Sequence, residues 1–190
     1  MTILKQIENL AEWFRVNVAP VHKSKVPPEK GKAITKDYQF VLANPSVHTF
    51  LFPDVEEFDP EGQPLQPAPS MILQLLDGME ESEARGGTSG TMRFRLVFSL
   101  WNPGLHTGEE FKRTADGWRD LFTLMDTTHA RMKKARILNG HTIRGGRIDF
   151  APLKEGGALI DSFPFFYGET NFETGFYKAV ETDIVEKLTH

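Results

Sequence analysis

The sequence predicts a single α+β domain over residues 1–190. We expect a largely antiparallel or mixed sheet of about four strands with a long helix packed on one face, helices at both ends and a protruding β-hairpin. Two neighbouring segments, 71–81 and 92–101, carry the apolar patterns of strands. A stripe of apolar residues at helical spacing runs from 111 to 132. With 39% hydrophobic and 25% charged side chains, the composition is that of one globular domain.

The first residues predict a helix, with Thr2 as its N-cap and Pro20 as its stop. Its apolar stripe consists of Ile3, Ile7, Leu10, Phe14 and Val18. Residues 20–68 then contain most of the 12 prolines and form an irregular arm, with one or two short strands expected near 47–52. A segment of this kind either wraps the core or reaches toward a partner.

The stretch "EARGGTSGT" at 83–91 lies between two predicted strands. A phosphate-binding loop needs a helix after its glycines, whereas here a strand follows. We therefore interpret it as the tip of a β-hairpin that spans 71–101. The base of this hairpin is apolar on both faces, and Trp101 at its end is a candidate interface anchor.

The outer part of the hairpin is charged, with acidic residues on the first strand and basic residues on the second. Cross-strand Glu–Arg pairs are expected there. Because an isolated two-stranded ribbon is marginal in water, we expect a neighbouring subunit to hold it. The residues expected at subunit contacts or along a lumen are Glu80, Glu81, Glu83, Arg85, Arg93 and Arg95.

A turn at 102–104 precedes the long helix, for which Thr107 is the expected N-cap and Phe111 the first residue of the apolar stripe. Two further strands are predicted at 146–153 and 162–176. A short closing helix is expected after them, with Tyr177, Val180, Ile184 and Leu188 on one side. At the start of the first of these strands, Arg144 and Arg147 flank two glycines, which favours a tight basic turn; the alternative is contact with an acidic partner or passing DNA.

No catalytic signature stands out. The absence of cysteine excludes thiolate metal sites and cysteine nucleophiles, and no pair of the six histidines has the spacing of a helical zinc site. We expect no cofactor, no metal and no enzymatic activity. The alternative is a cytosolic enzyme or ligand-binding domain with a helix–sheet pocket near Asp126 and His129. The net charge of −4 disfavours a general nucleic-acid binder, and no segment predicts a membrane span or signal peptide.

The order of these elements, together with "PSMILQLLDGMEE", "MRFRLVFSLWNPG" and "DGWRDLFTLMDTTHARM", resembles small tail-completion proteins of tailed phages and prophages. Within that group the chain is most similar to the tail terminator and head–tail joining class. The resemblance covers roughly residues 68–175, and the proline-rich segment departs from the compact members.

The resemblance implies a structural protein without a reaction. Such proteins form a homo-oligomeric ring, commonly a hexamer, on the growing tail tube in the host cytoplasm and then remain in the virion tail. The implied partners are other copies of the chain, the tail tube protein and head–tail connector proteins. Passing DNA would slide along an acidic lumen without sticking.

Overall fold

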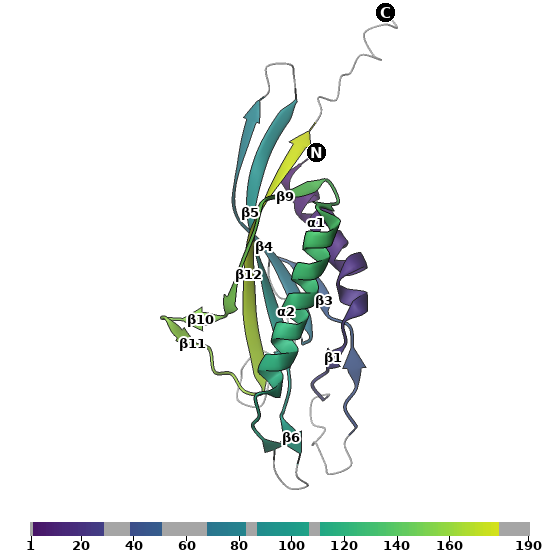
Figure 1. Cartoon of the computed structure of the whole chain (residues 1–190), viewed down its shortest axis with the longest axis vertical. Coiled ribbons are helices and arrows are strands. Elements are labelled where there is room, and N and C mark those ends of the chain that lie inside the picture. The colour runs from purple at the N-terminus through teal and green to yellow at the C-terminus, as the bar shows by residue number, and fades with distance from the viewer. Residues whose placement is uncertain (1, 29–38, 51–67, 83–86, 107–110, 179–190) are drawn as a thin grey trace, which may run out of the picture.

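A curled six-stranded sheet with two helices on one face forms the centre of the molecule (Figure 1). This computed structural model describes residues 2–28, 39–50, 68–82, 87–106 and 111–178. The strand order is β3-β4-β5-β12-β9-β8, and all pairs are antiparallel except β3 with β4. The strands are β3 (Ser46–Thr49), β4 (Ser70–Ser82), β5 (Thr88–Trp101), β8 (Ile137–Leu138), β9 (His141–Pro152) and β12 (Phe165–Lys178).

The N-terminal helix α1 (Ile3–Asn17) forms as its apolar periodicity predicts. The Oγ1 atom of Thr2 accepts a hydrogen bond from the backbone N–H of Lys5 at 3.3 Å, which confirms the N-cap. A 3-10 helix, η1 (Ala19–Val21), follows, with Pro20 near its start. The helix α1 packs against β3 and β4.

The central strand β5 is paired along its whole length with β12 and over most of its length with β4. It pairs with β4 from Ser99 to Thr88, and with β12 from Trp101 to Thr88. The hairpin of β4 and β5 is therefore confirmed, but it is not a two-stranded arm. Because β12 accompanies β5 to its tip, the charged end is part of a wider sheet.

The long helix α2 (Asp116–Ala135) starts later than predicted. Phe111 belongs instead to β7 (Phe111–Lys112), which pairs with β6 (Leu105–His106). Ala115 is the N-cap and has no capping side chain, but the Oγ1 atom of the preceding Thr114 accepts a hydrogen bond from the N–H of Asp116 at 3.3 Å. Thr107 lies outside the described residues. Among these residues, neither helix has the length and apolarity that a membrane crossing requires.

Two smaller strand pairs complete the description: β1 (Ser24–Lys25) with β2 (Leu42–Ala43), and β10 (Lys154–Glu155) with β11 (Ala158–Leu159). The first pair belongs to the proline-rich region. The part of this region that the structure describes contacts the rest of the domain. The ring of Phe40 lies 5.9 Å from that of Trp101, and Lys25 Nζ donates to Asn102 Oδ1 at 3.2 Å. These contacts favour the wrapping alternative for this part of the region.

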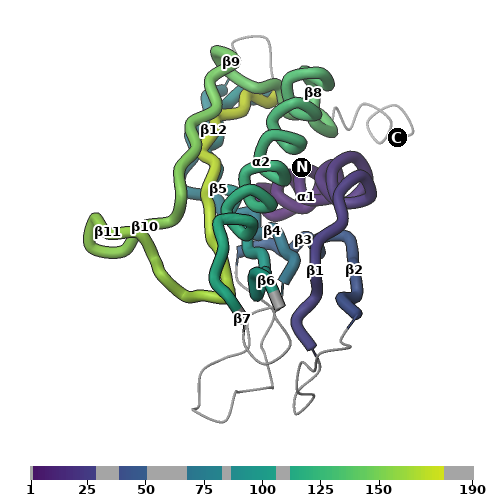
Figure 2. The backbone as a smooth tube through the Cα atoms, turned by 60° about the horizontal axis from the view of Figure 1, so that its bottom comes forward, coloured from purple at the N-terminus to yellow at the C-terminus, as the bar shows by residue number. Residues whose placement is uncertain are grey.

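We call the face of the sheet that α1 and α2 cover the inner face, and the opposite face the outer face. Figure 2 shows both helices on the same side of β9 and β12. The even-numbered residues of β5 from Met92 to Leu100 are at most 2% exposed and point to the inner face. Side chains of α1 and α2 pack against them in one core, including Phe14, Leu121 and Met125.

Two further expectations need correction. The sheet has six strands, not about four, because the short strands β3 and β8 add to its edges. The closing helix does not begin near Tyr177, because residues through Lys178 extend β12 and pair with β5. The rest of that predicted helix lies outside the described residues.

Candidate interface on the outer face of the sheet

Four arginines from two separate strands meet on the outer face of the sheet. Arg93 and Arg95 come from β5, and Arg144 and Arg147 come from β9. The sequence analysis assigned them to two different sites, the hairpin arm and a basic turn. The intervening strand β12 joins both into one surface, because it pairs with β5 on one side and β9 on the other.

Each of these arginines is matched by a carboxylate. Arg93 Nε donates to Asp77 Oδ1 at 2.8 Å, and Arg147 Nε donates to Asp149 Oδ2 at the same distance. The other two pairs are looser. Arg95 Nη1 lies 3.7 Å from Glu169 Oε2, and Arg144 Nη1 lies 3.5 Å from Glu173 Oε1. We call these eight residues the charge ladder: Asp77, Arg93, Arg95, Arg144, Arg147, Asp149, Glu169 and Glu173.

The ladder is solvated. Arg93 and Asp77 have side chains that are 59% and 52% exposed, and the hydrogen bond from Arg93 holds the pKa of the Asp77 carboxyl below its ordinary value. Pairs of this kind contribute little to folding stability because water screens them. Arg95 also donates from Nε to Gln74 Oε1 at 2.9 Å, which fixes its direction. The ladder therefore defines a neutral, ordered surface pattern more than it stabilises the fold.

Both edge strands change register at the same level of this face. In β4 the irregularity falls between Leu75 and Asp77, and in β9 it falls at 144–147, opposite Glu173. Gly145 and Gly146 adopt φ values of 62° and 64° there, a conformation that other residues rarely adopt. A groove of about 610 Å³ lies beside these bulges. Leu76, Arg93, Arg144, Arg147, Asp149 and Asn171 are among the residues that line it.

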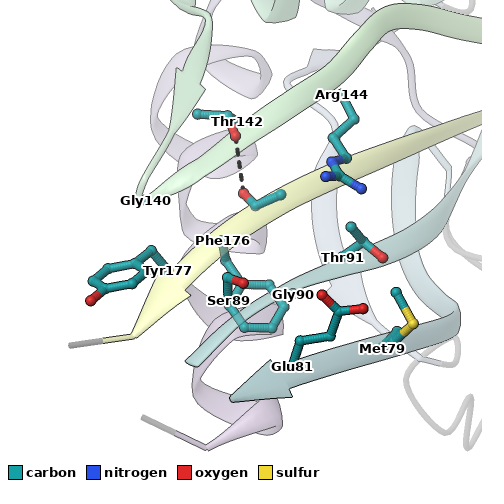
Figure 3. A pocket seen from close by; sticks show the side chains of 11 residues that line it. Met79, Glu81, Ser89, Gly90, Thr91, Gly140, Thr142, Arg144, Phe176 and Tyr177 are labelled. Carbon is teal, nitrogen blue, oxygen red and sulfur yellow. Dashed lines mark hydrogen bonds between the residues drawn. The ribbon is translucent and has the colours of Figure 1, made fainter. Parts of the chain in front are cut away.

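A second hollow of about 350 Å³ lies at the tip of the same sheet (Figure 3). Its floor is a row of paired small residues, Thr91, Gly175 and Thr142, and Thr142 Oγ1 donates to the carbonyl of Gly175 at 3.2 Å. Met79 and Tyr177 flank the row and are 54% and 62% exposed. Small residues in the middle and large ones at the rim form a shallow trough, a shape suited to another polypeptide.

The edges of the sheet are open on either side of this face. The strand β3 pairs with β4 only at Ser70–Leu73, and β8 pairs with β9 only at His141–Thr142. Within the described residues, no strand pairs with the free side of β4 at 75–82 or of β9 at 143–152. An unpaired strand edge presents backbone donors and acceptors that a further strand can use.

The register of the hairpin places neither of its two described glutamates opposite an arginine. Glu80 lies opposite Gly90 and Glu81 opposite Ser89, so both glutamates are closer to the tip than Arg93 and Arg95. Asp77 takes the position opposite Arg93 instead. Both glutamates remain on the exposed edge strand, while Glu83 and Arg85 lie outside the described residues. Trp101 is 4% exposed, so no open surface supports its predicted role as an interface anchor.

The sequence analysis missed the acidic half of the ladder. Glu169, Asn171 and Glu173 alternate with inner-face residues such as Phe172, and this period-two pattern in "GETNFET" was a readable signal for a polar strand face. Asp77 and Asp149 were harder to assign, because their partners depend on the bulges.

At the alternative site near Asp126 and His129, the histidine is buried and the aspartate is exposed. His129 is 7% exposed, its Nε2 lies 2.8 Å from Thr170 Oγ1, and its ring lies 5.3 Å from that of Phe150. Burial is the main cause that lowers its pKa. Asp126 is exposed on α2. In the part of the chain that the structure describes, no three histidine or carboxylate side chains lie together as a metal site would require.

No protein-family model matches the chain, and no curated protein matches it in sequence.

Proposed function

We propose that this chain is a non-enzymatic structural subunit of a phage or prophage tail, which forms a homo-oligomeric ring that terminates the tail tube or joins it to the connector. The observation that carries the proposal is the pair of open edges, β4 and β9, on opposite sides of one sheet. Two different edges on one subunit permit a head-to-tail contact, and such contacts generate rings when the rotation closes.

The strand directions suit this contact. Since β4, β5, β12 and β9 are successively antiparallel, β4 and β9 run in opposite directions. Copies related by rotation about an axis along the strands would pair β4 with the next copy's β9 as antiparallel neighbours. The sheets would then continue from subunit to subunit, as in strand addition to an exposed edge.

The two edges also differ in charge. Asp77, Glu80 and Glu81 give the open part of β4 a net charge of −3, whereas Arg144, Arg147 and Asp149 give the open part of β9 a net charge of +1. Opposite charges favour the β4–β9 contact over contacts between two β4 or two β9 edges. The bulges at both edges further restrict which strand fits, since an irregular edge pairs only with a matching partner.

The outer face supplies the surface that other partners would meet. Its arginines are paired with carboxylates, so a DNA molecule that passes over it finds few free cations and would not be trapped. In the proposed setting, the tail tube and connector proteins are the further partners. Assembly occurs in the host cytoplasm, and the ring then stays in the virion tail.

The test exchanges the charges of the two edges. One variant carries Glu80→Lys and Glu81→Lys, and the other carries Arg144→Glu and Arg147→Glu. Each alone places like charges at every contact and should remain monomeric. Mixed in equal amounts, they restore opposite charges at both kinds of contact and should form mixed rings of alternating copies. Light scattering after size-exclusion and native mass spectrometry measure the masses.

Wild-type protein at high concentration is the reference, and Lys154→Glu, an exposed position outside the sheet, is the matched control. The proposal predicts that the control assembles like the wild type. Self-assembly that neither double variant impairs would contradict a β4–β9 contact. A wild type that stays monomeric at every concentration would contradict self-assembly through these edges.

A further inference from the structure

An apolar groove of about 360 Å³ lies between the end of α2 and β9. Its apolar lining comes from both elements and their connection: Met132, Ile137, Ile143 and Ile148. Ile137 is 59% exposed although it adjoins Met132, which is completely buried. Two residues after Ile148, the ring of Phe150 is also 59% exposed and rests against His129. Apolar side chains thus extend from the buried core to the surface between α2 and β9.

The rim of this groove is basic. Lys133 and Arg136 line it, and both are exposed. In the described part of the chain neither forms an ion pair, in contrast to the arginines of the outer face. An apolar floor with unpaired cations at its rim fits a segment that carries apolar side chains between carboxylates.

Residues 179–190, "AVETDIVEKLTH", have this composition. The apolar residues Val180, Ile184 and Leu188 are spaced four apart, and three carboxylates against one lysine give the segment a net charge of −2. The spacing places the three apolar side chains on one face of a helix. The segment therefore complements the groove in both polarity and charge.

The segment also begins close to the groove. It follows Lys178, the last residue of β12, and Gly175 of the same strand pairs with Thr142, which lines the groove. Twelve residues span up to about 40 Å when extended, so the groove is within reach even after a reversal of direction. A short tether keeps the segment at an effective concentration near the millimolar range, which favours its own groove over that of another copy.

We propose that residues 179–190 dock into the groove between α2 and β9 of the same chain, with their apolar side chains on Ile137 and Ile143 and their carboxylates at Lys133 and Arg136. This docking covers apolar surface that would otherwise face water. It lies on the inner side of β9, away from the charge ladder, and does not rest on the proposed ring.

The chain has no cysteine, so introduced thiols give an unambiguous test. A chain with Ile137→Cys and Leu188→Cys is treated with a short bismaleimide, and the internal cross-link is measured by mass spectrometry. The matched control carries Leu159→Cys and Leu188→Cys, because Leu159 is similarly exposed at 53% but lies on β11. We expect about tenfold more internal cross-link in the first chain, owing to the raised local concentration.

Reversing the charges at the rim of the groove distinguishes docking of the segment from random collisions between the two cysteines. Lys133→Glu with Arg136→Glu should lower the cross-link to the level of the control, and adding Glu181→Lys with Glu186→Lys should restore it. Circular dichroism verifies that each variant is folded. Equal yields at Ile137 and Leu159 would overturn the proposal. So would a predominance of links between copies, shown by mixing single-cysteine chains with different tags, since the segment would then dock on a neighbour.

Discussion

The two halves of the central strands differ in how many faces they bury. At the base, the outer-face residues are buried as well as the inner-face residues with which they alternate. These outer-face residues are Val97, Ser99 and Trp101 of β5 and Tyr167 of β12. Burial raises the pKa of the Tyr167 hydroxyl to about 12. Toward the tip, Phe94 and Phe172 are buried, while Arg93 on the opposite face is exposed. The base is therefore core on both sides, and the tip is core on one side only.

This difference shows what holds the tip in place. One buried face and a third strand, β12, stabilise it without help from another subunit. The outer face of the tip is consequently available for recognition, because its ladder of charges is not needed for folding. The following changes test this division, from the largest expected effect to the smallest.

Val97→Asp places a carboxylate in the outer side of the base. Because an uncompensated buried charge is strongly unfavourable, we expect the free energy of unfolding to fall by about 3–5 kcal/mol. The same charge in Thr91→Asp, on the outer side of the tip, should change it by less than about 1 kcal/mol. Urea denaturation measures both. Similar losses for the two variants would contradict the division between base and tip.

Gly90→Ala tests the inner side of the tip. A Cβ atom at this position would lie 2.3 Å from the carbonyl oxygen of Met79 and 2.6 Å from the ring of Phe176. Overpacking of this kind costs about 1–3 kcal/mol, and the loss should appear in thermal unfolding. The neighbouring Ser89→Ala adds no atom and serves as the control. A stable Gly90→Ala protein would mean that the tip is loosely packed.

Acid should lower the free energy of unfolding through His141, which is buried on the inner face. This residue is 2% exposed, its Nε2 donates to the carbonyl of Gln6 at 3.2 Å, and burial lowers its pKa. A lowered pKa in the folded state means that the unfolded chain binds the proton more readily. The contribution of neutral His141 to the free energy of unfolding is therefore complete above pH 6.5, the ordinary pKa of histidine, and decreases as the pH falls below this value.

Urea denaturation between pH 7 and pH 5 measures this dependence. His141→Asn should unfold more easily at pH 7 but show a flatter dependence on pH than the wild type. His22, His48 and His129 also have lowered pKa values, so part of the slope remains in the variant. An unchanged slope would show that His141 is not protonated on unfolding in this range.

Arg95→Ala should have the smallest effect on folding. It removes the hydrogen bond to Gln74 and the ion pair with Glu169 on a partly solvated surface, for a loss below about 1 kcal/mol. Because Arg95 lies on β5, away from the edges of β4 and β9 through which the ring is proposed to form, assembly measured by light scattering should stay unchanged. A loss as large as that of Val97→Asp would place Arg95 in the core rather than in the ladder.

Local patterns were sufficient for several elements. The helix α1, the hairpin of β4 and β5, and the strands β9 and β12 follow from periodicity and turn residues within each segment. The start of α2 was misplaced, because Phe111 fits a helical stripe in sequence but pairs with β6 in space. The end of β12 was misassigned because Tyr177 fits a helical spacing, whereas pairing with β5 extends the strand to Lys178.

The sequence by itself therefore determined α1, the hairpin of β4 and β5 and the approximate positions of β9 and β12, and that the hairpin becomes charged toward its tip. Only the tertiary structure decided that Arg93 and Arg144 share one face, that Asp77 rather than Glu80 meets Arg93, and that β12 accompanies the tip. The reason is physical. Side-chain periodicity is a property of one segment, whereas register and strand order depend on backbone hydrogen bonds between distant segments and on bulges that shift them.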